Sequence, residues 1–354
     1  MKRLCFFTAV LAALMLFCAC GGADVTVTVT PDEPEQAAVI PTEAVTVEPV
    51  QTAAPSSGEA SSTEFKKGGR GGMFSGPSND ETVLAVLAEC APKFEQRTFT
   101  DPDTGFVLEY SLYIPEVWDG TEKLPLIQFM PDSTGTGRSA QNLVENYYGA
   151  AVWASERDQA KHPCFVLVPA YTEAIADDNW GTSPQLETGV RLIHALTEEF
   201  NLDTDRFYTT GQSGGCMASL HFADEYPELF AASLFVSGQW DIAVLDKLKD
   251  YPFFYITAGG DQKASGGQTE VLAMLDAAAV PYSYGTWSAQ DGPDAQNDAA
   301  QALVDEGLKA NFVRFETGTV AGEGAATVNE HMASFNYAYK LEPVRDWLFE
   351  QVRE

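Results

Sequence analysis

The chain has 354 residues, of which 51 are Asp or Glu and 21 are Lys or Arg, so its formal net charge is −30. A chain this acidic lacks the basic surface that neutralises phosphates, and we therefore expect no binding to nucleic acid. Hydrophobic residues make up 45% of the sequence, which is enough to build a large buried core.

The first 19 residues have the composition of an export signal. Two basic residues precede an apolar run over 4–17, which is shorter than the about 20 residues that a transmembrane helix needs. Ala19, Cys20 and two glycines follow, and this ending resembles a bacterial lipoprotein signal, in which the cysteine is lipidated and becomes the new N-terminus. We expect a signal peptide over 1–19, a lipid anchor on Cys20 and an extracytoplasmic protein held at the cell membrane. An ordinary cleaved secretory signal is the alternative.

Residues 20–80 differ in composition from the rest of the chain. They are rich in Thr, Pro, Glu, Val, Ala, Ser and Gly, and 21–64 contain acidic residues but no Lys or Arg. The prolines recur often enough to break any ladder of strands. We expect a disordered tether that holds the following domain, 81–354, off a membrane. A glycosylated or wall-binding segment is the alternative.

Beyond the tether, short apolar runs alternate with amphipathic segments. The predicted strands are, in chain order, 106–114, 124–130, 164–170, 206–210, 230–236, 253–257, 282–287 and 311–315. The predicted helices are 139–157, 186–200, 214–226, 269–279, 294–306 and 331–352. This alternation predicts an α/β domain with a mostly parallel sheet covered by helices on both faces. In such sheets the loops at the carboxyl ends of the strands carry the chemistry.

One of these loops holds a GxSxG pattern with Ser213 at its centre, between the strand 206–210 and the helix 214–226. The sharp turn lifts the serine hydroxyl above the sheet edge, and the glycines avoid clashes with the neighbouring backbone. The first N–H groups of the helix are unpaired and point toward an incoming oxyanion. The context predicts a nucleophilic serine, with a glycine-rich structural turn as the alternative.

A serine nucleophile needs a base, and the chain has four histidines. His194 falls in the middle of a helix, His221 lies two turns beyond Ser213, and His162 precedes a strand at the opposite sheet edge. His331 follows the last predicted strand and a glycine-rich loop, from which it can reach the carboxyl edge. Elimination and position favour His331 as the base. A surface residue at a helix start is the alternative.

The third member of a triad orients the histidine and stabilises its cation. Asp261 follows a buried strand through a glycine turn, and it lies between the serine and the histidine in the chain, which is the order expected of this fold. We therefore choose Asp261. Asp241 is the second candidate, ahead of Asp291 and Asp294 in a later polar loop.

These segments resemble the α/β-hydrolase superfamily. Within it the sequence is similar to secreted esterases of the polyhydroxybutyrate depolymerase-like and feruloyl-esterase-like types, and to prolyl-oligopeptidase-type catalytic domains. The resemblance spans about residues 95–354, and the matching stretches are 124–130, 205–217, 257–261, 330–332 and 344–349. It implies an α/β-hydrolase fold and a serine hydrolase of carboxylic esters that needs no metal or organic cofactor. The expected substrate is a small-molecule or oligosaccharide ester.

The resemblance also implies an oxyanion hole made of two backbone N–H groups. One belongs to Gly214, directly after the nucleophile. The other comes from the loop after the strand 124–130, where related enzymes usually have His-Gly and this chain has Pro131-Asp132-Ser133. The second donor is then Asp132 or Ser133. An aspartate carboxylate at this place would repel an oxyanion unless it points away.

Two other functions stay open at this point. Prolyl-oligopeptidase relatives share the serine elbow, so a serine peptidase is the first alternative, although those proteins usually carry a large propeller where this chain has its tether. An inactive binding protein on a hydrolase scaffold is the second alternative. Trp153, Trp180, Trp240 and Trp287 are candidates to line a sugar or aromatic site, although tryptophan packs more often in the core.

Two smaller features of the domain also carry expectations. Cys90, Cys164 and Cys216 form no CxxC or His–Cys cluster, so we expect no structural zinc. Three buried free thiols are favoured over a Cys90–Cys164 disulfide. The helix and strand inserted between 287 and 331 are an addition to the usual pattern, and they either extend the sheet or form a wall beside the substrate.

Overall fold

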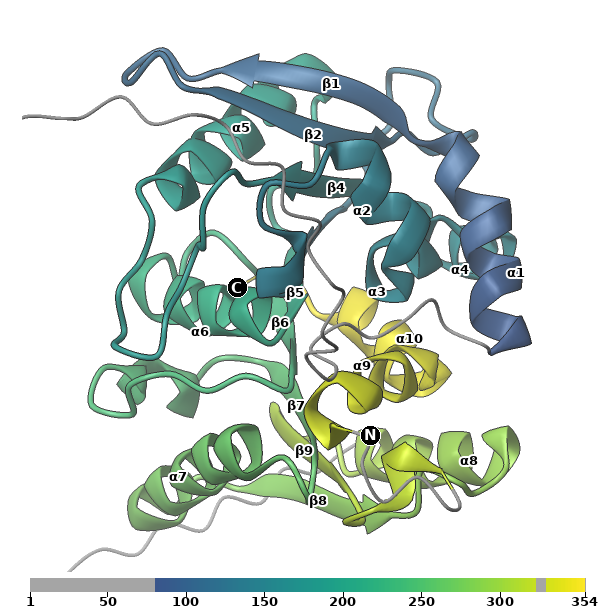
Figure 1. Cartoon of the computed structure of the whole chain (residues 1–354), viewed down its shortest axis with the longest axis vertical. Helices are drawn as coiled ribbons and strands as arrows, with labels where there is room; N and C mark the ends of the chain where they lie inside the picture. The colour runs from purple at the N-terminus through teal and green to yellow at the C-terminus, as the bar shows by residue number, and fades with distance from the viewer. Residues whose placement is uncertain (1–79, 323–328, 354) are drawn as a thin grey trace, which may run out of the picture. The chain divides into compact units, whose positions relative to one another are not determined.

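A computed structural model describes residues 80–322 and 329–353 of the chain (Figure 1). The predicted signal peptide, Cys20 and nearly all of the predicted tether lie outside the described residues. The strands are β1 Glu95–Thr100, β2 Val107–Tyr113, β3 Leu126–Met130, β4 Phe165–Ala170, β5 Phe207–Gln212, β6 Ala232–Val236, β7 Phe253–Ala258, β8 Tyr282–Trp287 and β9 Ala310–Phe315. The helices are α1 Glu81–Cys90, α2 Ala140–Asn146, α3 Tyr148–Ala151, α4 Glu156–Lys161, α5 Gln185–Phe200, α6 Gly214–Glu225, α7 Gln262–Ala278, α8 Pro293–Asp305, α9 Glu330–Lys340 and α10 Glu342–Glu350. No helix within these two ranges has the length and apolar composition needed to cross a bilayer.

Among the described residues, nine strands form one sheet in the order β1-β2-β4-β3-β5-β6-β7-β9-β8. β2 runs antiparallel to both of its neighbours, β1 and β4, and all other neighbouring strands are parallel. β3 to β7 are buried at every residue. A strand that is covered on both faces has no side exposed to solvent, which explains why most of these segments are rich in apolar residues. β5 is the exception, with Thr209, Thr210 and Gln212 among its buried residues. The prediction of a mostly parallel, covered sheet is confirmed.

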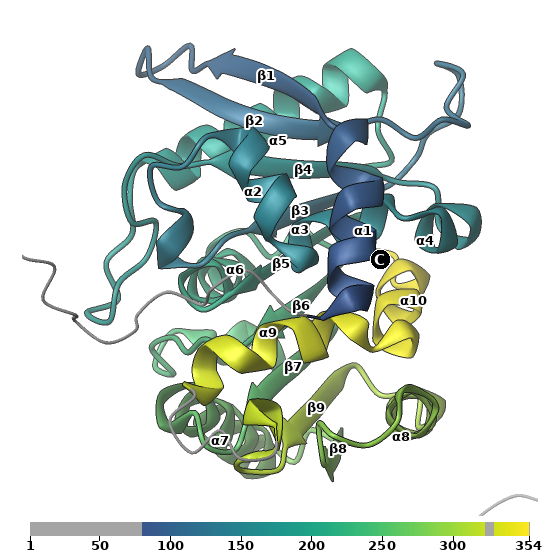
Figure 2. The same cartoon turned by 45° about the vertical axis from the view of Figure 1, so that its right-hand side comes forward.

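Helices cover both faces of the sheet (Figure 1, Figure 2). α5, α6 and α7 lie on one face, where Leu196, Leu220 and Leu275 belong to one buried cluster. The remaining helices lie on the other face, where Tyr339 of α9 and Val344 of α10 belong to a second cluster. The two apolar cores hold the central strands, β3 to β7, between two layers of helices.

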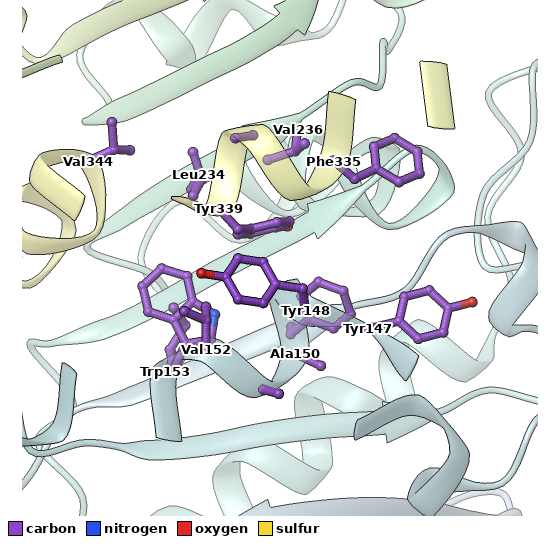
Figure 3. Packing of buried hydrophobic residues seen from close by; sticks show 14 of the residues in the cluster. Tyr147, Tyr148, Ala150, Val152, Trp153, Leu234, Val236, Phe335, Tyr339 and Val344 are labelled. Carbon is purple, nitrogen blue, oxygen red and sulfur yellow. The ribbon is translucent and has the colours of Figure 1, made fainter. Parts of the chain in front are cut away.

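Tyr339 anchors α9 to the sheet (Figure 3). Its ring packs edge-to-face against Phe129 of β3 and against Trp153, with ring centroids 5.9 and 6.4 Å away. The hydroxyl of Tyr339 lies 3.0 Å from Thr210 Oγ1 on β5. Gly149 of α3 makes room for the ring, because an added Cβ there would lie 2.4 Å from it. The helix is therefore held against the strand that leads to the serine elbow.

Two predicted helices are broken in the structure. The segment 139–157 forms α2, α3 and the start of α4 instead of one helix, and Ser155 begins α4 by accepting a hydrogen bond from the Asp158 N–H at 3.3 Å. The segment 331–352 forms α9 and α10. The break falls just before Pro343, which has no N–H to donate to the preceding turn. α1 and β1 were not predicted.

The inserted helix–strand segment extends the sheet. β9 lies between β7 and β8, and it pairs with both over its full length. α8 packs beside α10 on the face of the sheet, away from the loops that carry the predicted site (Figure 2). The three cysteines of the domain are buried and unpaired, as predicted.

Candidate active site

Ser213 lies at the turn between β5 and α6 with φ of +53° and ψ of −117°. A residue with a Cβ rarely adopts a positive φ, so the backbone here is strained. The flanking glycines permit the turn through close backbone contacts. An added Cβ on Gly211 would lie 2.4 Å from the backbone of Gly215, and one on Gly215 would lie 2.0 Å from the carbonyl oxygen of Met130. The sequence G-x-S-x-G is thus what allows α6 to approach β3 this closely.

The structure brings Ser213, His331 and Asp261 into one row. His331 Nε2 lies 2.7 Å from Ser213 Oγ, and His331 Nδ1 lies 2.6 Å from Asp261 Oδ2. The Asp261 side chain is buried, and its Oδ1 also accepts from the Ala264 N–H at 3.3 Å, which caps α7. A carboxylate in this place can orient the imidazole, and the imidazole can take the proton of the hydroxyl.

Two contacts that were not predicted hold the start of α9 at the sheet edge. Ser334 Oγ donates to the His331 carbonyl oxygen at 2.8 Å and lies 2.7 Å from the hydroxyl of Ser237, which follows β6. The Glu330 carboxylate accepts from the Gly260 N–H at 3.2 Å, directly beside the acid. Single Ser and Glu residues at the ends of elements form no recognisable motif, so these contacts could not be predicted from the sequence.

The backbone amides of Gly214 and Ser133 lie side by side. An added Cβ on Gly214 would lie 3.6 Å from the Ser133 nitrogen, which is the one atom within 4 Å of it. Neither N–H donates to another group in the part of the chain that the structure describes. Ser133, rather than Asp132, therefore provides the free amide next to Gly214. Two unpaired N–H groups beside a hydroxyl are the arrangement that stabilises a tetrahedral oxyanion.

The Asp132 carboxylate is occupied by other donors. Its Oδ1 accepts from the N–H and the hydroxyl of Thr134 at 2.8 and 2.6 Å, and from the Tyr147 hydroxyl at 3.4 Å. Its Oδ2 accepts from Gln212 Nε2 at 2.8 Å. The side chain is only 4% exposed. The orientation of Asp132 thus avoids the direct repulsion that a carboxylate facing the oxyanion would cause.

A small hollow that is partly open to solvent lies beside these two amides. Its walls are the loop after β3 and the loop after β4. The lining residues are Pro131, Asp132, Ser133, Gly135, Thr136, Tyr171, Glu173, Ala174, Ile175, Ala176 and Gly214. Small and apolar side chains predominate in this lining, next to the carboxyl groups of Asp132 and Glu173.

The rejected histidines and the second acid candidate lie elsewhere. His194 is exposed on α5, and the ring of His221 lies 5.6 Å from that of Trp240. His162 stacks on a phenylalanine near the C-terminus. Asp241 accepts from the Ala243 N–H at 3.0 Å and so caps its own turn. None of these side chains makes a hydrogen bond to the described members of the row.

Of the four candidate tryptophans, one is available to a ligand. Trp153, Trp240 and Trp287 are buried in the core, whereas Trp180 is 42% exposed. Trp180 lies in the loop between β4 and α5 with φ of +65°, and its ring lies 5.7 Å from the buried ring of Trp240. Among these four tryptophans, Trp180 is therefore the one that is exposed enough to stack on a ligand.

Neither a thiol nor a set of metal ligands competes with the serine. Cys216 lies three residues after Ser213, but it is fully buried, and burial raises the pKa of its thiol far above the ordinary value. A buried protonated thiol is a poor nucleophile. Within 80–322 and 329–353, no group of three or more His, Cys, Asp or Glu side chains is placed to hold a metal ion.

The sequence matches no protein-family model and no curated protein. Solved structures do resemble it. A thermostable esterase is 27% identical with a TM-score of 0.56, and the match covers 75% of this chain and 64% of that enzyme. A mutant of the feruloyl esterase module from Clostridium thermocellum, complexed with sinapinate, is 10% identical with a TM-score of 0.51, covering 78% and 94%. An acylaminoacyl peptidase from Pyrococcus horikoshii is 13% identical with a TM-score of 0.46, covering 74% and 42%.

This chain therefore spans less than two thirds of the length of the thermostable esterase that it matches. Together with the strand order of the sheet, these likenesses show that the described domain has the α/β-hydrolase fold.

Proposed function

We propose that the protein is a serine hydrolase that cleaves carboxylic esters, with Ser213, His331 and Asp261 as its catalytic residues. The row of hydrogen-bond distances of 2.7 and 2.6 Å, next to the free amides of Ser133 and Gly214, carries the proposal. The likeness to an esterase at 27% identity supports an ester rather than an amide substrate. Esters of carbohydrates or small aryl and acyl esters suit the small hollow beside the amides.

The proposed reaction has two halves. Ser213 Oγ attacks the ester carbonyl carbon while its proton passes to His331 Nε2, and Asp261 stabilises the imidazolium. The carbonyl oxygen becomes an oxyanion that accepts from the Ser133 and Gly214 N–H groups. As the tetrahedral intermediate collapses, His331 gives the proton to the leaving alcohol and an acyl-enzyme remains. Water, deprotonated by His331, attacks this ester, which releases the carboxylic acid and restores the serine.

Fluorophosphonate labelling and p-nitrophenyl acetate hydrolysis test the proposal. Ser213→Ala and His331→Ala should abolish both signals, and Asp261→Asn should lower kcat by about 10⁴-fold, because the imidazole loses its orienting carboxylate. His221→Ala and Asp241→Asn are matched controls that should stay active. Equal activity of the Asp241 and Asp261 variants would contradict the assignment of the acid.

The same assay separates the two alternative functions. An aminoacyl p-nitroanilide that is cleaved faster than the corresponding ester would favour a serine peptidase. A folded wild-type chain that neither reacts with fluorophosphonate nor hydrolyses an ester would favour a binding protein on a hydrolase scaffold. Ester hydrolysis that clearly exceeds anilide hydrolysis is the result that we expect.

We also propose that the mature protein is an exported lipoprotein anchored to the cell membrane through Cys20. The support is the sequence of 1–22, with its apolar run followed by a cysteine and two glycines. Metabolic labelling with a fatty-acid analogue should mark the wild type and the Cys18→Ala control but not Cys20→Ala. A processed but unlabelled wild type would indicate an ordinary secretory signal instead.

A further inference from the structure

We propose that Asp132 and Gln212 are positioning residues that set the distance between the two oxyanion donors. The inference rests on the proposed function, because it concerns the same two amides. These donors belong to different segments: Ser133 lies in the loop after β3, whereas Gly214 opens α6 after β5. Something must fix the spacing between them, because an oxyanion is stabilised only by donors that are placed in advance.

The backbone ladder between the two segments stops short of the site. β3 and β5 are paired from Leu126 onward, and the last pair in the register is Met130 with Gly211. The next connection across is the hydrogen bond of 2.8 Å from Gln212 Nε2 to Asp132 Oδ2. Both residues are buried. A side-chain bond thus continues the ladder beyond its last pair, and it lies one residue before Ser133 and two residues before Gly214.

The second carboxylate oxygen fixes the direction of the loop. Asp132 is the N-cap of a short 3₁₀ helix, Ser133–Gly135, and its Oδ1 accepts from the Thr134 N–H at 2.8 Å. The carbonyl oxygen of Thr134 in turn accepts from Arg138 Nε at 2.6 Å. The Ser133 N–H lies between two bonded residues, Asp132 with its bond to Gln212 and Thr134 with its bond to Asp132, so its direction is restrained. One carboxylate therefore sets both the spacing and the orientation of the second donor.

The pairing depends on complementary chemistry. A carboxylate only accepts hydrogen bonds, and three of the four donors around Asp132 come from Thr134 and Tyr147 of its own segment. The Gln212 amide is the donor that reaches Asp132 from the serine elbow. Gln212 is the variable residue before the serine of the GxSxG pattern, and in this chain it supplies the donor that binds Asp132. Exchanging donor and acceptor between the two positions should restore the bond.

The test uses the full chain and three variants. Gln212→Glu places two carboxylates in contact, and kcat for p-nitrophenyl acetate should fall by about 10²-fold, as expected for a donor displaced by about 1 Å. The Asp132→Asn/Gln212→Glu double variant reverses the bond, because the Asn amide donates to Glu while its oxygen still accepts from Thr134. Its kcat should return to within about tenfold of the wild type.

The matched control is Gln296→Glu. Gln296 is also a buried glutamine, and its Nε2 donates to the carbonyl oxygens of Ala289 and Asp291, beside α8. This substitution should lower Tm without changing kcat. All rates are divided by the concentration of active sites, measured as the sites that fluorophosphonate labels at completion. Unfolded protein then does not lower the apparent kcat.

The outcomes are distinct. Loss of kcat in Gln212→Glu with recovery in the double variant is the expected result. A folded Gln212→Glu with wild-type kcat, or a loss that the double variant does not reverse, overturns the pairing. If Gln212→Glu does not fold, Gln212→Met removes the donor without adding charge, and wild-type kcat in that variant overturns the proposal as well. A wild-type chain without labelling or ester hydrolysis refutes the proposed function, and the pairing with it.

Discussion

Gly215 is the glycine of the elbow whose replacement has the clearest consequence. It opens α6 together with Gly214, and it faces the end of β3, directly before the loop that carries Ser133. In Gly215→Ala the added methyl group would lie 2.0 Å from the Met130 carbonyl oxygen, 2.5 Å from the Met130 carbonyl carbon and 2.7 Å from the Pro131 carbonyl oxygen. All three are backbone atoms, so no change of rotamer can relieve the contact.

The displacement can be worked out from these distances. Ordinary van der Waals contact begins near 3.4 Å, so α6 and β3 must move apart by about 1.4 Å. Overpacking of this kind lowers the free energy of unfolding by about 1–3 kcal/mol. The same movement separates the Ser133 and Gly214 amides, and a misplacement of about 1 Å lowers kcat by about 10²-fold. We expect both effects in Gly215→Ala.

Thermal unfolding and p-nitrophenyl acetate kinetics measure the two effects separately. Gly266→Ala is the control, because the added Cβ on α7 would meet nothing within 4 Å. It should keep kcat and unfold at the same or a higher temperature, since alanine favours a helix over glycine by about 1 kcal/mol. A Gly215→Ala protein with wild-type kcat and Tm would refute the reasoning, because the close approach of α6 to β3 would then not be needed.

Three further predictions concern the rest of the domain. Ser334→Ala removes the hydroxyl that joins the His331 carbonyl to the loop after β6. The free energy of unfolding in urea should fall by about 1 kcal/mol, and kcat in the ester assay should fall by more than this loss of stability explains. Arg191 donates to the buried Asp101 and holds the pKa of that carboxyl well below its ordinary value of 3.8. The ionised Asp101 therefore stabilises the folded protein above pH 3.8, and this contribution is lost as the pH falls below 3.8. Urea unfolding should therefore show Asp101→Asn to be less stable than the wild type by about 2 kcal/mol at pH 7 and nearly equal at low pH, and an equal difference at both would contradict the ion pair. In a protein of residues 80–354, a thiol reagent should detect no cysteine until denaturant is added and three afterwards, because burial raises the pKa of each thiol, to about 12 for Cys90.

Most central strands could be predicted from the sequence because burial on both faces makes them rich in apolar residues. β1 could not. It lies at the edge of the sheet, pairs among the described residues with β2 alone, and is exposed or half-buried at every residue. Its Glu95, Gln96 and Arg97 suit an edge strand that must not attract a second chain, but they hide the strand from a search for apolar runs. The sequence contains the cause of the helix break, Pro343, but the apolar periodicity of 331–352 continues across the proline and led to the prediction of a single helix.

The positions of the three residues of the row followed from general geometry. Parallel strands present their carboxyl ends at one edge, so Ser213, Asp261 and His331 could be paired by chain order and loop position. The second donor could not be chosen in this way. The choice between Asp132 and Ser133 depends on which amide lies next to Gly214, and Gln212, which binds the Asp132 carboxylate before that amide, comes from another segment.

A sheet places the site only approximately, and side-chain bonds refine it. Neighbouring strands are about 4.8 Å apart, whereas catalytic groups must be held to within about 0.5 Å. Three hydrogen bonds, each between a strand or helix and a loop at this sheet edge, refine these positions: Gln212 to Asp132, Ser334 to Ser237, and Gly260 to Glu330. Each joins residues that are far apart in sequence and contributes little to the buried core. Substitutions at these bonds should therefore lower kcat more than Tm. Substitutions among the core residues around Tyr339 should lower Tm more than kcat, because they change the packing of whole helices and leave these three hydrogen bonds in place.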